Sequence, residues 1–134
     1  MAKTGDSYVV TLKKAHLEWG THRYTHTRGR IYGEGYLPIP ARRARAYEIY
    51  NSNNTGGYDV LGVNIFNCQS RDGFLNCEMK AQGCSTAGSV YAKQFSVDDD
   101  LRALGDWYAH IGAVEGDRVR VTWMSATDIV LEKI

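Results

Sequence analysis

The basic run at residues 19–30, WGTHRYTHTRGR, limits the possible folds of this chain more than any other segment. It contains three arginines and two histidines among threonine, tyrosine and glycine, and it contains no acidic residue. A core strand made of this run would bury unpaired cations, which is strongly unfavourable. The run must therefore face solvent, as a plain exposed hairpin, or an anionic partner. Because guanidinium groups bind phosphates and guanine edges, the second interpretation is an arm that enters nucleic acid.

The length and composition indicate one domain rich in strands. The 134 residues are enough for a single core and too few for two, so we expect one domain over residues 1–134. Fourteen glycines, two prolines and frequent Val, Ile, Thr and Tyr favour strands and tight turns. No apolar run reaches membrane-spanning length and no signal-peptide core is present, so we expect a soluble cytoplasmic protein.

The three cysteines, Cys68, Cys77 and Cys84, are an odd number without a C-x-x-C pair. This spacing favours reduced, packed thiols over a disulfide framework or a zinc site. We therefore expect neither a metal nor another cofactor.

The charge is distributed unevenly along the chain, although the formal net charge is only +1. Residues 1–50 contain nine Lys and Arg against four Asp and Glu, whereas residues 51–134 contain seven against eleven. Such segregation produces a local positive patch on a nearly neutral protein, and that patch can attract an anionic ligand.

Hydrophobic periodicity and turn residues predict six or seven strands and two short helices. Residues 118–125 alternate in the period of two that is typical of a half-buried strand, and they form a final hairpin with residues 128–134. Pro40 suits the first position of a short helix that packs Ala41, Ala44 and Tyr47 inward. Ser96 is a candidate cap for a second helix that begins at residues 98–100. The other expected strands are residues 8–13, the hairpin of 60–68 with 74–81, and extended structure over 89–97. Together these elements predict a small, mainly β, mostly antiparallel barrel.

The order of these elements resembles that of the B3-type DNA-binding pseudobarrel. The matching features are Leu37-Pro38 followed by a helix at 41–49, and a helix at 101–111 followed by Gly116-Asp117. Five strings further resemble the effector domain of bacterial restriction endonucleases that carry a phospholipase-D-like nuclease: GRIYGEGYLPIP, IYNSN, KAQG, YAKQF and LGDWY. The resemblance implies an open barrel of about seven strands that binds double-stranded DNA in the major groove through two arms. It also implies a bacterial protein. The H-x-K pair that the phospholipase-D-like nuclease needs is absent from this sequence, so cleavage would belong to another domain or another chain, or would be absent.

The resemblance places the first arm at residues 19–36 and the second at residues 82–94. On the first arm the expected DNA contacts are Arg23, Tyr24, His26, Arg28, Arg30 and Tyr32. On the second arm they are Gln82, Ser85, Thr86, Ser89, Tyr91, Lys93 and Gln94, whose donors and acceptors suit base edges. A plain polar surface loop remains the alternative for the second arm. The helix arginines Arg42, Arg43 and Arg45 suit phosphate contacts better than base contacts, although an exposed helix face explains them as well.

Two other functions from different classes remain open. Asp72, Glu78 and Lys80 resemble the acid, acid, lysine signature of Mg²⁺-dependent nucleases, in which two carboxylates bind the metal. Asp72-Gly73 is, however, also an ordinary hairpin turn, and Glu78 and Lys80 would share one face of a strand. The other alternative is a protein-interaction barrel without a nucleic-acid role. Sequence-specific DNA binding without a catalytic residue is the favoured hypothesis.

Overall fold

A computed structural model describes residues 1–17, 35–52, 58–83, 90–97, 100 and 102–134. The described strands are β1 (Ser7–Thr11), β2 (Leu37–Pro38), β3 (Ile65–Ser70), β4 (Asn76–Gln82), β5 (Gln94–Ser96), β6 (Arg118–Trp123) and β7 (Asp128–Lys133). The described helices are α1 (Lys14–Leu17), α3 (Ala41–Ala46) and α4 (Ala103–His110).

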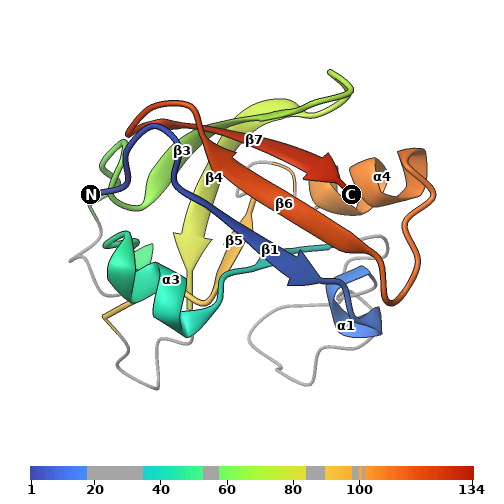
Figure 1. Cartoon of the computed structure of the whole chain (residues 1–134), viewed down its shortest axis with the longest axis horizontal. Coiled ribbons are helices and arrows are strands. Elements are labelled where there is room, and N and C mark those ends of the chain that lie inside the picture. Colours follow the sequence, from blue (N-terminus) through green and yellow to red (C-terminus); the bar gives the residue numbers. More distant parts are fainter. Residues whose placement is uncertain (18–34, 53–57, 84–89, 98–99, 101) are drawn as a thin grey trace.

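The seven strands form one sheet that curls into a nearly closed barrel (Figure 1). Their order is β1-β6-β7-β3-β4-β5-β2, and every pair is antiparallel except β3 with β7. The two edge strands, β1 and β2, approach each other, because the Tyr8 hydroxyl donates a hydrogen bond of 3.1 Å to the carbonyl of Pro38. The protein is therefore mainly β, with an open pseudobarrel of seven strands, as the sequence predicts.

The two predicted hairpins are confirmed, but the strand ends differ from the prediction in the hairpin expected over residues 60–68 and 74–81. In the last hairpin Val119, Val121 and Trp123 of β6 are fully buried, as their alternation predicts. The other hairpin begins at Ile65 rather than at residue 60. The Asn64 side chain causes this difference, because it accepts a 2.7 Å hydrogen bond from the Val60 amide and folds residues 60–64 into a turn. Strand β1 ends at Thr11, two residues before the predicted end.

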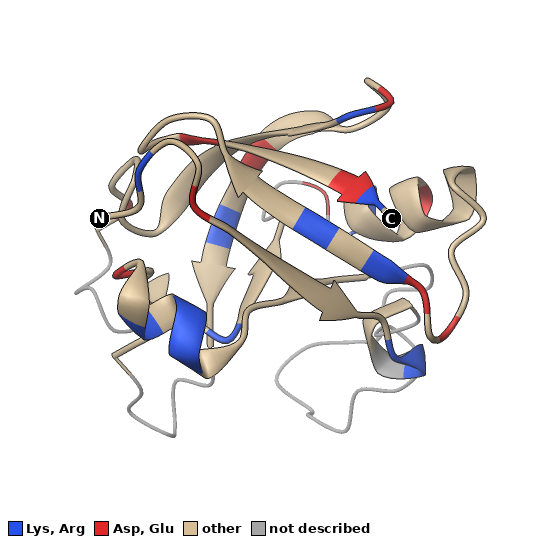
Figure 2. Ribbon diagram, viewed as in Figure 1, with Lys and Arg blue, Asp and Glu red and all other residues tan. Residues whose placement is uncertain are grey.

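Helix α3 confirms the predicted helix after Pro40 (Figure 1), but Pro40 occupies the N-cap rather than the first helical position, and the helix ends at Ala46 rather than at residue 49. Ala44 is fully buried and Tyr47 packs against the core, but Ala41 is exposed, so its predicted inward position is wrong. Arg42 and Arg45 of α3 are exposed and Arg43 is half-buried, and Figure 2 shows basic residues on this helix. A one-turn helix that the sequence did not predict, α1, precedes residue 18.

Helix α4 confirms the second predicted helix but begins later than expected. It starts at Ala103, and Leu104, Trp107 and Tyr108 are its buried residues. The predicted cap at Ser96 is wrong, because Ser96 lies in β5 and its hydroxyl donates to the Gln82 side chain instead.

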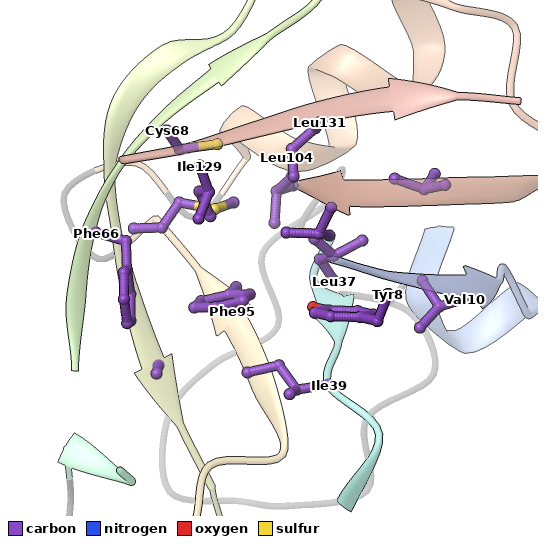
Figure 3. Packing of buried hydrophobic residues seen from close by; sticks show 14 of the residues in the cluster. Tyr8, Val10, Leu37, Ile39, Phe66, Cys68, Phe95, Leu104, Ile129 and Leu131 are labelled. Atoms are coloured by element: carbon purple, nitrogen blue, oxygen red, sulfur yellow. The ribbon is translucent and has the colours of Figure 1, made fainter. Parts of the chain in front are cut away.

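A single cluster of buried side chains fills the described part of the barrel (Figure 3). It includes residues from β1, β2, β3, β5 and β7 together with Leu104 of α4. Cys68 is a buried free thiol whose pKa is raised by burial, and Cys77 is a half-buried free thiol whose pKa burial raises to about 11. Both confirm the prediction of reduced, packed cysteines, and Cys84 lies outside the described residues.

Candidate nucleic-acid interface

The residues around α3 fix the helix so that its arginines face outward. Ala44 is buried against the core, and the Tyr47 hydroxyl at the C-terminal end donates a 2.8 Å hydrogen bond to the carbonyl of Ser7. Glu48 adopts a positive φ of 55°, which ends the helix after Tyr47. Anchored on one side by Ala44 and Tyr47, the helix presents Arg42 and Arg45 to solvent.

The basic side chains of this region have no carboxylate partner among the residues that the structure describes. Within the part of the chain that the structure describes, no salt bridge involves Arg42, Arg43, Arg45 or Lys93. In the rest of the barrel some basic side chains are paired, as Arg71 and Arg120 are with Glu132. Lys133 is paired with Asp117, whereas Arg118 of β6 has no ion pair among the described residues. Figure 2 shows basic residues on α3, β6 and α1, and acidic residues on α4 and near the end of β7. The uncompensated charge on α3 suits an anionic ligand.

Aromatic rings support two of the three arginines. The Arg43 guanidinium lies 5.9 Å from the centre of the Tyr47 ring and donates a 3.3 Å hydrogen bond to its hydroxyl. The Arg45 guanidinium lies 6.0 Å from the centre of the Tyr91 ring. Cation–π contacts of this kind orient a guanidinium without neutralising it. Arg45 therefore connects α3 to a residue of the predicted second arm.

Four of the predicted second-arm residues are described, and they lie where β4 ends and β5 begins. Gln82 is half-buried, its side-chain oxygen accepts from Ser96, and its carbonyl accepts a 2.8 Å hydrogen bond from the Lys93 amide. Gln94 is half-buried in β5, opposite both Gln82 and Pro38, whereas the Lys93 side chain is exposed. We call residues 82–83 and 90–93 the base of the second arm. Ser85, Thr86 and Ser89 lie outside the described residues.

Tyr91 stacks on Tyr50, a residue for which the sequence pattern predicted no role. Their ring centres are 5.6 Å apart and their planes differ by 17°. The neighbouring Asn51 is 1 % exposed and was also missed. Asparagine-rich turns usually lie on the surface, so the string YNSNN gave no signal that its first asparagine is buried.

The predicted first-arm residues Arg23, Tyr24, His26, Arg28, Arg30 and Tyr32 lie outside the described residues. The residues that flank this segment meet one another. The Tyr36 amide donates to the His16 carbonyl at 3.2 Å, and the two rings form an edge contact with centres 5.1 Å apart. Burial, together with Lys13, lowers the pKa of His16, and its Nδ1 accepts a hydrogen bond from the Lys13 amide. Tyr36 is held further by the Tyr108 hydroxyl, which donates to its carbonyl at 2.9 Å.

The chain returns from both predicted arms into neighbouring strands. The first returns through Tyr36 into β2 and the second through Lys93 into β5, and Pro38 of β2 is opposite Gln94 of β5. With a rise of about 3.4 Å per residue and a strand spacing of about 4.8 Å, Tyr36 and Lys93 are about 11 Å apart. Because β2 and β5 are antiparallel, the two returns lie at opposite ends of this short strand pair, at the edge of the sheet that β2 forms.

The three residues of the nuclease alternative have separate contacts. Asp72 accepts hydrogen bonds from the Ser70 hydroxyl, from the Phe74 amide at 2.9 Å and from the Trp107 indole at 3.0 Å. These hydrogen bonds, first that of Ser70, lower the pKa of Asp72. Glu78 is exposed on β4, and Lys80 forms a 3.2 Å ion pair with Asp59. Among the described residues, no three His, Cys, Asp or Glu side chains come together as a metal site.

Comparisons with protein-family models, with curated proteins and with solved structures find no match to this chain. None of the described helices is both long enough and apolar enough to cross a membrane.

Proposed function

We propose that this chain binds double-stranded DNA in a sequence-specific manner, as the target-recognition module of a restriction endonuclease. The observation that carries the proposal is a group of four basic side chains on α3 and at the base of the second arm that form no ion pair within the described part of the chain, namely Arg42, Arg43, Arg45 and Lys93. They adjoin the barrel edge to which both predicted arms return. A duplex bound at this edge would supply the missing negative charge.

The two kinds of residue in this region suit two kinds of DNA contact. Exposed arginines on a short helix suit phosphates, which fix orientation without reading sequence. The amides of Gln82 and Gln94 and the ammonium of Lys93 suit base edges, where a bidentate contact can discriminate one base pair from another. The separation of about 11 Å between Tyr36 and Lys93 is comparable to the width of a major groove, about 12 Å.

The fold supports the same proposal. An open pseudobarrel of seven strands, with one segment before β2 and another between β4 and β5 as arms, is the architecture that the B3 resemblance implies. In this role the chain recognises the target site, and a nuclease domain or chain with its own catalytic residues cuts the DNA.

A titration of labelled DNA with the whole chain tests the proposal. We expect the protein to bind a duplex pool more tightly than single strands of the same sequences, with affinity that falls steeply as salt rises. Equal, salt-independent signals from both forms would contradict DNA binding and favour the protein-interaction alternative.

Incubation of the same protein with plasmid and Mg²⁺ or Mn²⁺ separates binding from catalysis. We expect the plasmid to remain intact. Specific cleavage that the change Glu78→Ala abolishes would contradict the proposal and support the Mg²⁺-dependent nuclease instead.

A further inference from the structure

Residues 49–51 connect the end of α3 to the base of the second arm. The Ile49 amide donates to the Ala44 carbonyl of α3 at 2.9 Å, and the Ile49 carbonyl accepts from the Ala92 amide at 3.0 Å. Two residues further along the chain, the Asn51 amide donates to the Val90 carbonyl at 2.9 Å. Between these two bonds the rings of Tyr50 and Tyr91 stack. Main-chain hydrogen bonds and one ring stack therefore join the helix to the returning side of the arm base.

The side chain of Asn51 also contacts the outgoing side of the arm base. A Cβ atom placed on Gly83 would lie 2.9 Å from Nδ2 of Asn51 and 3.2 Å from its Cγ. The φ angle of Gly83 lies outside the left-handed region, so this position requires glycine because of the close approach and not because of its backbone conformation. Asn51 is 1 % exposed and lies between the two sides of the base. Its side-chain amide packs against Gly83, and its main-chain amide is hydrogen-bonded to Val90.

We propose that Asn51 is a positioning residue for DNA sequence recognition, which couples the phosphate-binding helix α3 to the base-reading residues of the second arm. This inference rests on the proposed function. Asn51 is buried and uncharged, so its contribution comes from the placement of Gln82, Lys93 and Gln94 relative to α3 rather than from a contact of its own with DNA. Phosphates bound by α3 would then fix the register in which the arm meets the bases.

This arrangement gives Asn51 a signature that differs from that of a direct contact. A change at Asn51 or Gly83 leaves the arginines and the reading side chains in the protein, so the salt dependence of binding is unchanged. The reading side chains are displaced, however, and a lost bidentate contact is equivalent to about 5- to 150-fold in discrimination between a cognate and a mismatched duplex. We therefore expect Asn51→Ser and Gly83→Ala to reduce the discrimination ratio within this range and to leave the salt slope as in the wild type.

A double-mutant cycle tests the contact itself. Because both changes perturb one contact, we expect the protein with both to discriminate no worse than the poorer single variant, and the changes in urea midpoint to be non-additive as well. Ser70→Ala is the matched control, since it removes a buried polar side-chain contact, that of the Ser70 hydroxyl with the Leu75 amide, at the β3–β4 turn and away from α3. It should lower stability and keep full discrimination. If Gly83→Ala does not fold, the discrimination ratio of Asn51→Ser compared with that of Ser70→Ala still tests the role of Asn51.

The outcomes separate the inference from the proposed function. A wild-type protein that binds every duplex alike, or none, overturns the sequence-specific function and with it the role of Asn51. The urea midpoints of the single and double variants would still report the contact between Asn51 and Gly83. A wild-type protein that discriminates, together with an Asn51→Ser variant that discriminates equally well, overturns the inference alone. Additive effects in both cycles, or a changed salt slope, would also overturn it.

Discussion

Arg42 provides the sharpest test of the phosphate-binding helix, because it is exposed on α3 and has no ion-pair partner among the described residues. Each phosphate contact on B-DNA contributes about 0.9 to the slope of log K against log salt. Removal of one contact by Arg42→Ala should therefore lower the slope by about 0.9. Between about 50 and 200 mM salt, a fourfold change, the variant should lose about 3.5-fold less affinity than the wild type. Fluorescence anisotropy with cognate and scrambled duplexes measures both quantities, and the two duplexes should be affected alike.

Arg71→Ala is the control for this measurement. It removes the same charge, but Arg71 lies in the β3–β4 turn and forms a 3.1 Å ion pair with Glu132. We expect its salt slope to remain that of the wild type. If Arg42→Ala left the slope unchanged, or changed which sequence is preferred, then α3 would not be a phosphate-binding element and the assignment of roles within the interface would be wrong.

Three further predictions concern stability and sequence readout. Tyr8→Phe removes the hydrogen bond that joins the two edge strands and should lower the free energy of unfolding by about 1–2 kcal/mol in urea titrations; an unchanged value would show that this bond does not hold the barrel closed. Asp72 has a lowered pKa in the folded state, so its contribution to stability is present above the unfolded-state pKa of about 3.9 and is lost as the pH falls through the lower folded-state value. Asp72→Asn should accordingly reduce the urea midpoint at neutral pH but not in strong acid, and an equal difference at both would contradict this cause. Gln94→Ala should relax preference at one base pair by about 1–3 kcal/mol in competition assays, whereas the exposed Gln69→Ala should not; equal effects of the two changes would remove Gln94 from the reading residues.

The sequence predicted the elements whose structure depends on neighbouring residues. The alternation in β6 and the Pro40 signal before α3 are local patterns, and both elements are present in the structure. The exposed arginines of α3 follow from the same helix periodicity, because a buried Ala44 directs Arg42 and Arg45 outward.

Features that depend on contacts between distant segments were not predictable in this way. The parallel pairing of β3 with β7 joins residues about sixty positions apart, such as Asn67 and Asp128, and no local pattern specifies it. Ser96 has the chemistry of a helix cap, yet pairing of β5 with β4 places its hydroxyl on the Gln82 side chain. Asn51 looks like a turn residue in the sequence, but it is buried against Gly83 and Val90 at the base of the second arm. In each case a tertiary partner determined the role of a residue with an ambiguous local preference.

Selection from a random duplex pool is the most direct test of the central claim, which is that this chain reads DNA sequence without cutting it. The whole protein is incubated with the pool and Mg²⁺ at low salt, and the bound duplexes are recovered and sequenced over several rounds. We expect one short sequence to be enriched, every recovered duplex to be intact, and the enrichment to fail when Arg42, Arg43 and Arg45 are all replaced by alanine. Bound duplexes that keep the base composition of the starting pool, or that are cut at a fixed site by this chain alone, would contradict the claim.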